Sequence, residues 1–152
     1  MIVRPAVQSD VPELVEMAET FIEESAYEIE FDVTNSAYHY MNYILSPGGD
    51  VLVAKQDGAM VGGVMVASST EFQKKPFGYV GKFYVIPEAR RGTASRSLIA
   101  AMLDWFTLQD VSHVFVTATA GLEERDQRAF ILLMKRSGFV EEGPVMYKVM
   151  EG

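Results

Sequence analysis

The 152-residue chain contains no cysteine and only two histidines, His39 and His113. Without a thiol, neither a disulfide nor a cysteine nucleophile is available. The two histidines lie far apart in the sequence and lack metal-ligand spacing, so no metal site is expected. The chain also lacks a Gly-Lys-Ser or Gly-Lys-Thr triplet and a three-glycine dinucleotide fingerprint, which excludes two common glycine-loop nucleotide sites.

Long apolar runs are missing as well. No stretch approaches the length of a membrane span, and the first residues lack the apolar core of a signal peptide, so a cytoplasmic protein with no membrane partner is expected. Lys and Arg total 13 against 21 Asp and Glu, a net charge of −8, which argues against nucleic acid as a partner. A chain of this size, 49% apolar and 22% charged, predicts one globular domain over residues 1–152.

Residues 83–102 combine an apolar strand, a short basic loop and an amphipathic helix. The strand stops at Pro87, which cannot donate to a sheet ladder. The helix that follows begins with free backbone N–H groups and the positive end of its dipole, and small residues before it let an anion come close. The segment therefore predicts an anion site, with charge from Arg90, Arg91 and Arg96. An ordinary turn with solvated arginines is the competing interpretation.

Helical spacing of apolar residues predicts four helices. The first covers about residues 10–24 with Ser9 as its N-cap. The second has Thr34 or Ser36 as its N-cap and ends before the Ser-Pro-Gly-Gly run that starts at Ser46. The other two are expected at about 94–108 and 127–136.

Apolar runs bounded by turn residues predict the strands, and glycines inside one of them predict a bulge. The strands are expected at 2–6, 51–55, 60–67, 77–86, 111–117, 139–140 and 145–149. Gly78 and Gly81 lie inside the strand 77–86, which is typical of a bulge. The order β-α-α-β-β-β-α-β-α-β predicts an α/β (α+β) protein. Its single mixed, mostly antiparallel sheet is flanked by helices on both faces.

This order, with the segment 83–102 after the fourth strand, resembles the GNAT superfamily of acetyl-CoA-dependent N-acetyltransferases. Four stretches carry the resemblance: Ile-Val-Arg-Pro-Ala at 2–6, Asp-Gly at 57–58, Phe-Tyr-Val…Pro-Glu…Arg-Arg-Gly-Thr over 83–93, and Lys-Arg-Ser-Gly-Phe at 135–139. The resemblance implies direct transfer of an acetyl group from acetyl-CoA to a primary amine. The implied partner is a small-molecule or peptide amine, and the oligomeric state, a homodimer included, stays open.

The resemblance also implies a cofactor site, with a divergent pyrophosphate loop. Ala94 and Arg96 occupy the two positions of the loop that are small in the family. Ala94 is acceptable if its backbone angles are ordinary, whereas Arg96 either clamps a phosphate from the side or obstructs it. Gln127 falls where the family commonly keeps an Asn near the pantetheine arm. The implied acetyl-CoA-binding residues are Phe83, Val85, Arg91, Gly92, Thr93, Ala94, Ser95, Arg96 and Gln127.

Two proton-transfer groups that the family often carries are missing. The Tyr that commonly protonates the leaving thiolate falls on Met134, and the fourth strand holds no carboxylate base. Tyr79, which either relays a proton through water or merely packs, is the predicted catalytic residue. A backbone N–H of the bulged strand near Val85 is the expected oxyanion donor. Because these groups are missing, a catalytically inactive CoA-binding sensor or assembly protein is the alternative function.

The segment between the first two helices is acidic and aromatic, and in this family it usually borders the acceptor cleft. Glu28, Glu30 and Tyr38 are therefore predicted to bind the acceptor. Carboxylates and aromatic faces together suit a cationic amine, through Coulomb attraction and cation–π contact. The competing interpretation is a solvated loop whose aromatic side chains fill the core.

Overall fold

The computed structural model describes residues 1–117, 122–143, 146 and 148–150. The elements are β1 (Ile2–Pro5), the short 3-10 helix η1 (Gln8–Asp10), α1 (Val11–Glu24), α2 (Val33–Leu45), β2 (Gly49–Gln56), β3 (Ala59–Ser69), β4 (Phe77–Val85), the 3-10 helix η2 (Pro87–Ala89), α3 (Ala94–Leu108), β5 (Val114–Val116) and α4 (Glu124–Arg136). The strands form one sheet in the order β1-β2-β3-β4-β5, antiparallel except for the β4–β5 pair. The expected mixed, mostly antiparallel sheet is confirmed.

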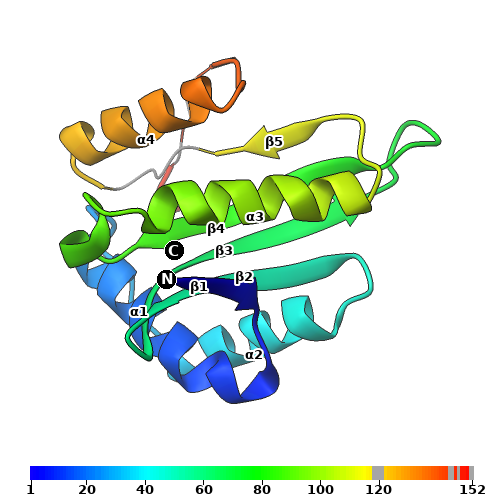
Figure 1. The fold of residues 1–152 in the computed structure, drawn as a ribbon. Coiled ribbons are helices and arrows are strands. Elements are labelled where there is room, and N and C mark those ends of the chain that lie inside the picture. The colour runs from blue at the N-terminus through cyan, green and yellow to red at the C-terminus, as the bar shows by residue number, and fades with distance from the viewer. Residues whose placement is uncertain (118–121, 144–145, 147, 151–152) are drawn as a thin grey trace.

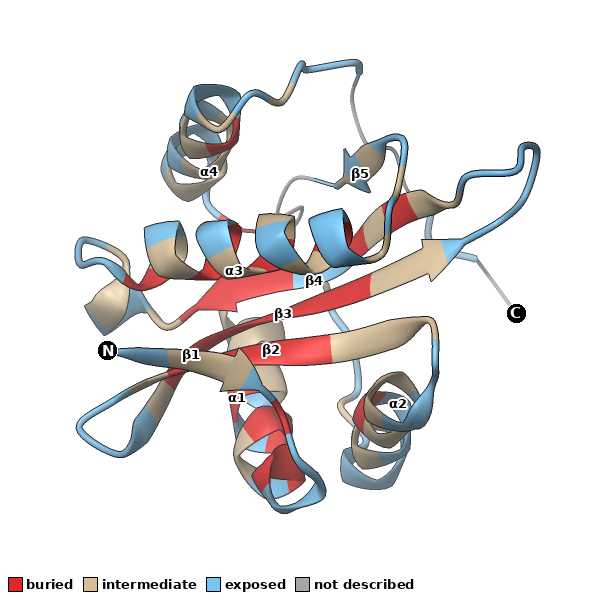
Figure 2. Ribbon diagram, turned by 45° about the vertical axis from the view of Figure 1, so that its right-hand side comes forward, coloured by how far each residue is buried: buried red, intermediate tan, exposed pale blue. Residues whose placement is uncertain are grey.

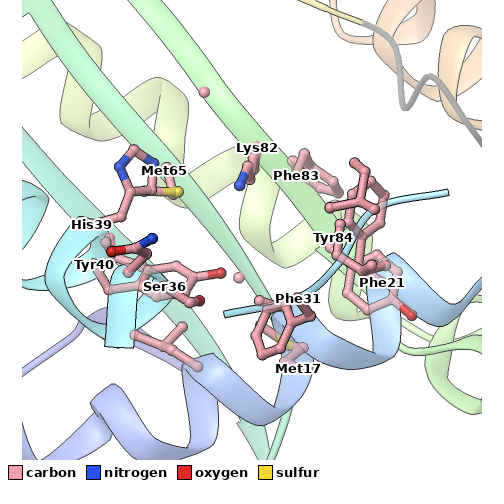
Figure 3. Close-up of a pocket in the computed structure, with 18 of the residues that line it drawn as sticks. Met17, Phe21, Phe31, Ser36, His39, Tyr40, Met65, Lys82, Phe83 and Tyr84 are labelled. Atoms are coloured by element: carbon pink, nitrogen blue, oxygen red, sulfur yellow. The ribbon is translucent and has the colours of Figure 1, made fainter. Parts of the chain in front are cut away.

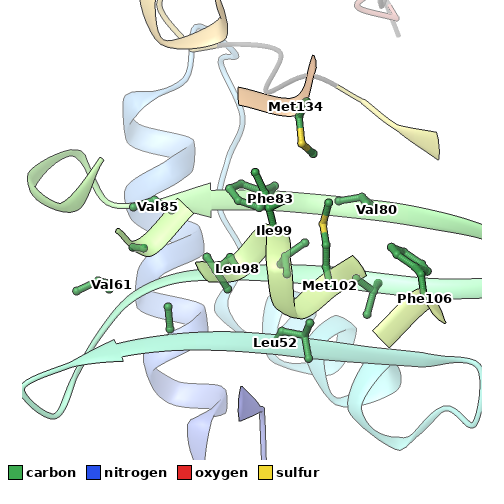
Figure 4. Close-up of a cluster of buried hydrophobic side chains, with 14 residues drawn as sticks. Leu52, Val61, Val80, Phe83, Val85, Leu98, Ile99, Met102, Phe106 and Met134 are labelled. Atoms are coloured by element: carbon green, nitrogen blue, oxygen red, sulfur yellow. The ribbon is translucent and has the colours of Figure 1, made fainter. Parts of the chain in front are cut away.

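Helices cover both faces of this sheet. In Figure 1, α3 lies on one face with α4 beyond it, and α1 and α2 lie on the other. On the α3 face, Leu98, Met102 and Phe106 pack against inward side chains of β2, β3 and β4 (Figure 4). We call this group of buried residues, which also includes Phe83 and Met134, the α3 cluster. On the opposite face, α1 and α2 pack against β2 and β3 through Leu14 and Tyr40. Burial is therefore greatest along the middle strands (Figure 2), and no helix of the described part is long and apolar enough to cross a membrane.

Several expected boundaries are wrong, each for a local reason. The N-cap of α1 is Asp10, and Ser9 lies one residue earlier in η1. The cap of α2 is the side chain of Asp32, which accepts a hydrogen bond from the Asn35 N–H at 2.8 Å, so neither Thr34 nor Ser36 starts this helix. Helix α4 begins at Glu124, because the charged residues before Gln127 form its first turn.

The last expected strands are not part of the described sheet. Residues 139–140 follow α4 in an irregular conformation. Of the strand expected over 145–149, residues 145 and 147 lie outside the described residues, and 146, 148 and 149 are irregular.

Strand β4 carries the predicted bulge at Gly81. Strand β3 pairs Met65 with Lys82 and Val66 with Val80, which leaves Gly81 as the extra residue. Among the described residues, β5 pairs with β4 only over residues 78–80, so the two strands part at this point. A bulge changes the direction of the side chains that follow it. As a result, Lys82 faces α1 and α2, whereas Phe83 packs in the α3 cluster.

Asp10 fixes the start of α1 from a buried position, 3% exposed. Its carboxylate accepts hydrogen bonds from Arg4 at 2.7 and 3.0 Å and from the Val7 N–H at 2.8 Å, and the Lys55 amine lies 3.3 Å away. The hydrogen bonds from Arg4 are the main reason that the pKa of Asp10 lies well below its usual range.

Asp10→Asn is expected to lower the free energy of unfolding at pH 7 by about 2–4 kcal/mol, because Arg4 and Lys55 lose their buried anion. The folded-state pKa of Asp10 is depressed, so this stabilisation is present at neutral pH. It is lost as the pH falls below about 4 toward the folded-state pKa. Urea unfolding of both proteins at several pH values measures the difference. A difference that stays constant in acid would contradict the assignment to the carboxylate.

Candidate functional site

Two cavities meet at β4, where this strand parts from β5. The larger, the α2 cavity, has a volume of about 730 Å³ and lies between the sheet, α1, α2 and the segment 27–32. The smaller, the α4 cavity, has a volume of about 290 Å³ and lies between β4, the start of α3 and α4. Phe83 and Tyr84 belong to the walls of both cavities, so β4 is the partition between them.

The α2 cavity is lined mainly by apolar side chains. They include Met17, Phe21, Phe31, Tyr40 and Met65 (Figure 3). The lining also contains polar side chains. The charged or titratable ones include Glu30, Asp32, His39 and Lys82. An apolar cavity of this size with a few polar groups has the character of a small-molecule site.

His39 on α2 and Lys82 on β4 stand on different walls of the α2 cavity, and the Lys82 amine points into the space between the walls (Figure 3). Neither side chain has a hydrogen bond or an ion pair with a described residue. Although solvent reaches both through the cavity, its walls remove part of their hydration. This desolvation lowers the pKa of both groups, and the Lys82 cation lowers the pKa of His39 further. The His39 imidazole is therefore neutral at pH 7 and able to accept a proton.

The bulge glycine leaves room for the side chain that supports His39. The rings of His39 and Tyr43 meet edge to face with their centres 5.3 Å apart. A Cβ atom at Gly81 would lie 3.0 Å from the Tyr43 hydroxyl. A side chain at the bulge would therefore require a small shift of the Tyr43 hydroxyl.

A polar network centred on Arg90 ties the elements around the two cavities together. The Arg90 guanidinium donates to the two oxygens of Glu24 at 2.5 and 2.7 Å, to Asp126 at 3.3 Å, and to the Val85 carbonyl at 2.9 Å. The Tyr84 hydroxyl donates to the same Glu24 carboxylate at 2.6 Å. Contrary to expectation, Arg90 is thus not free to bind an anion. It joins α1, the end of β4 and α4.

The N-terminus of α3 is open to an anion. Thr93 precedes the helix without a side-chain cap, and Ala94 starts it as a fully buried helical residue, so alanine is accommodated there. Arg91 and Arg96 are exposed, and neither has an ion pair with a described residue. Free N–H groups beside two unpaired guanidinium groups suit an anion.

Some of the other predicted cofactor residues line the α4 cavity, and others lie outside its lining. Phe83, Val85 and Ser95 line the α4 cavity. Gln127 does not line it, because its side-chain amide donates to the Leu122 carbonyl at 2.6 Å. Helix α4 instead presents Asp126, Ala129 and Phe130 to the cavity, and Met134 is buried in the α3 cluster. The assignment of Gln127 stays a prediction.

The predicted substrate and catalytic residues are also only partly brought together. Glu30 lines the α2 cavity, Glu28 is exposed outside its lining, and Tyr38 is 70% exposed on the outer side of α2. Tyr79 stacks on Phe115 with ring centres 5.7 Å apart and is in the described lining of neither cavity. The roles of Glu28, Tyr38 and Tyr79 therefore stay predictions.

Neither His39 nor Lys82 is among the site residues that the sequence predicts. A signal for both is nevertheless present. His39 shares the sheet-facing side of α2 with Ser36 and Tyr43 at helical spacing. This side of an amphipathic helix is normally apolar, so a polar residue on it is a candidate for a functional role. Lys82 directly follows a glycine in an otherwise apolar strand, where a bulge turns it to the other face.

Comparison with known proteins identifies a family and confirms the fold. A model of the acetyltransferase (GNAT) family matches residues 13–139. Among curated protein sequences, none matches the chain significantly.

Three solved structures illustrate the shared fold. An aminoglycoside acetyltransferase from an uncultured soil metagenomic sample, in complex with sisomicin, is 21% identical with a TM-score of 0.71, and the alignment covers 99% of this chain and 96% of that one. Ribosomal-protein-alanine N-acetyltransferase from Brucella melitensis biovar Abortus 2308 is 16% identical with a TM-score of 0.73, covering 99% and 98%. AAC(6')-Iy in complex with the bisubstrate analogue CoA-S-monomethyl-acetylneamine is 14% identical with a TM-score of 0.74, also covering 99% and 98%. At these identities the likeness establishes the fold.

Proposed function

Since the chain belongs to the acetyltransferase (GNAT) family, we propose that it transfers the acetyl group of acetyl-CoA to a primary amine by direct attack. The observation that carries the proposal is the meeting of the two cavities at Phe83 and Tyr84. The α4 cavity, next to the open N-terminus of α3, would hold acetyl-CoA, and the α2 cavity would hold the amine. Acetyl-CoA supplies the acetyl group as an activated thioester. Holding both reactants at one partition gives the proximity on which such a transfer depends.

In this proposal His39 is the proton acceptor. A primary amine is mostly protonated at pH 7 and must lose a proton before its nitrogen can attack. The neutral His39 imidazole faces the cavity and takes that proton. The new N–C bond forms as the C–S bond breaks, and a second proton passes from the nitrogen to the leaving thiolate. A backbone N–H in the part of β4 beyond Gly81, near Val85, is the proposed donor to the carbonyl oxygen.

Two carboxylates in the wall of the α2 cavity, Glu30 and Asp32, support the predicted cationic acceptor. Asp32 also accepts a hydrogen bond from the Asn35 N–H, which leaves its negative charge in place. The aminoglycoside acetyltransferase of the same fold was obtained with sisomicin, so the fold accommodates an amine-bearing ligand. The interior of the cavity, however, carries the Lys82 cation.

Release of CoA thiol with a panel of primary amines tests the proposal. Thiol release that depends on both acetyl-CoA and an amine is expected. Binding of acetyl-CoA without thiol release for any amine would instead support the alternative function, a catalytically inactive CoA-binding sensor or assembly protein. Absence of acetyl-CoA binding in calorimetry would contradict both.

Replacing Arg91 and Arg96 together with Ala is expected to weaken acetyl-CoA binding by about 2–4 kcal/mol, because two unpaired charges near the diphosphate are removed. Isothermal titration calorimetry measures the change. Arg128→Ala is the matched control, since Arg128 is an exposed arginine on α4 that is paired with Glu124. An unchanged affinity in the double variant would overturn the diphosphate assignment. Tighter binding by Arg96→Gly alone would show that Arg96 obstructs the loop and does not clamp the phosphate.

A further inference from the structure

Lys82 is the only lysine or arginine among the described residues that line the α2 cavity. It projects from the middle of the sheet, opposite Met65 on β3, into a space bounded largely by aromatic and methionine side chains. No carboxylate of the described residues lies within ion-pair distance of its amine. Lys82 therefore has no ion-pair partner among the described residues, although the Glu30 and Asp32 carboxylates line the same cavity.

Lys82 is exposed to the solvent that reaches the cavity, and the apolar walls replace only part of its hydration. The other lysines and arginines near the sheet do not share this situation. Lys55 pairs with Glu13 at 3.1 Å, and Arg90 pairs with Glu24 and Asp126. A bound anion that contacts Lys82 would provide the missing partner and would be held by a charge-assisted hydrogen bond.

We propose that Lys82 binds a carboxylate of the acceptor, and that the acceptor is an α-amino acid with an apolar side chain. This inference rests on the proposed function. The amine of such an acceptor lies one carbon from its carboxylate, so pairing with Lys82 holds the amine in the same cavity as the His39 imidazole and next to the bulge of β4. The apolar walls, with Met17, Phe21 and Phe31, accept the side chain.

The same arrangement disfavours an amine without an acidic group. Such an amine leaves Lys82 unpaired and, while protonated, is repelled by it in a cavity where screening by water is reduced. The Glu30 carboxylate in the same lining would instead favour a purely cationic acceptor. Lys82 would weaken the binding of a cationic acceptor and strengthen the binding of an amino acid, so the two acceptors are distinguished by replacing Lys82.

Matched pairs of amines test the proposal: L-phenylalanine with 2-phenylethylamine, L-leucine with 3-methylbutylamine, and L-methionine with 3-(methylthio)propylamine. The members of a pair differ only by the carboxylate. For the wild-type enzyme, kcat/KM from thiol release is expected to be about 10- to 100-fold higher for the amino acid, the usual worth of one charge-assisted hydrogen bond. In Lys82→Met this ratio should fall to about one through a higher KM for the amino acid, and Lys82→Arg should restore most of it.

The assays are run at about pH 8.5, where His39 is neutral with or without the Lys82 cation. Lys74→Met, which removes an exposed lysine outside both cavities, is the control and should keep the wild-type ratio. Equal kcat/KM within each pair, or an undiminished ratio in Lys82→Met, would overturn the carboxylate contact while leaving the proposed function intact.

If no amine is acetylated, binding measurements distinguish failure of the carboxylate contact from failure of the proposed function. Calorimetry of each pair in the presence of CoA then measures the preference without turnover. Tighter binding of the amino acid in the wild type, lost in Lys82→Met, supports the contact even though the proposed function has failed. Equal binding of the two members, or no binding of either, overturns the contact between Lys82 and the carboxylate.

Discussion

His39→Ala is expected to lower kcat/KM for amine acetylation at pH 7 by about two to four orders of magnitude, the usual contribution of a positioned general base. The imidazole faces the α2 cavity without a described hydrogen-bond partner, and its removal takes away the proposed proton acceptor. The affinity for acetyl-CoA and the thermal stability should change little. Asn42→Ala, at an exposed position of the same helix outside the cavity lining, is the matched control. An undiminished rate in His39→Ala would rule out the proposed base.

The pH dependence of the rate would test the proposed role of His39 as the base independently of the size of that loss. Its pKa lies below the ordinary value of 6.5, so kcat/KM should fall as the pH decreases through that lowered pKa and His39 becomes protonated. The groups that surround the imidazole are Lys82 on β4, Glu30 in the cavity wall, and Tyr40 and Tyr43 on α2. Burial raises the pKa of Tyr40 to about 12, so Tyr40 does not titrate in this range.

Removing the Lys82 cation separates its effect from that of burial. In Lys82→Met the acid limb of the profile should move to higher pH, because the cation no longer opposes protonation of His39. In His39→Ala the limb should disappear, and added imidazole should restore part of the rate. The acceptor amine contributes its own limb at higher pH, which stays in every variant. A limb that persists in His39→Ala would belong to another group.

Phe106→Ala is expected to lower the free energy of unfolding by about 3–5 kcal/mol, the usual cost of truncating a buried aromatic side chain. Phe106 is 2% exposed and lies in the α3 cluster near the start of β4 (Figure 4). Chemical denaturation measures the loss, and Phe106→Leu should cost less because it leaves a smaller cavity. A loss below about 1 kcal/mol would show that the surrounding side chains refill the space.

The contact of Phe106 with Gly78 gives the sharper test. A Cβ atom at Gly78 would come within 2.7 Å of two ring carbons of Phe106. The backbone there is held by the Gly78 N–H, which donates to the His113 carbonyl at 2.7 Å. Gly78→Ala should therefore cost about 1–3 kcal/mol in the wild type and clearly less in Phe106→Leu, where the ring is absent. Equal costs in both backgrounds would show that the ring does not limit this position.

The repeating apolar patterns were sufficient to predict much of the fold. Helix α3 has the bounds 94–108 that its periodicity predicts, and the glycines of β4 correctly indicate a bulge. The cap of α2 was not predictable in the same way, because Asp32, Thr34 and Ser36 are all good N-cap residues. Which of them acts depends on where the preceding loop places the chain, and that is set by packing against the sheet.

The candidate site was less predictable, because its parts meet only after folding. Arg90 looks like a free loop arginine in the sequence, yet its partners Glu24 and Asp126 are 66 and 36 positions away. Lys82 faces the cavity because one extra residue precedes it in the strand, and a single-residue shift sends a side chain to the opposite face. His39 gains its chemical character from the apolar walls and from Lys82, neither of which adjoins it in the sequence.

The partition formed by β4 has a kinetic consequence. Its two cavities are bounded by different helices, the larger by α1 and α2 and the smaller by α3 and α4, on opposite faces of the sheet. If the smaller cavity holds acetyl-CoA and the larger holds the amine, as proposed, both substrates would occupy the enzyme at the same time. In that case the first product would not have to depart before the second substrate enters.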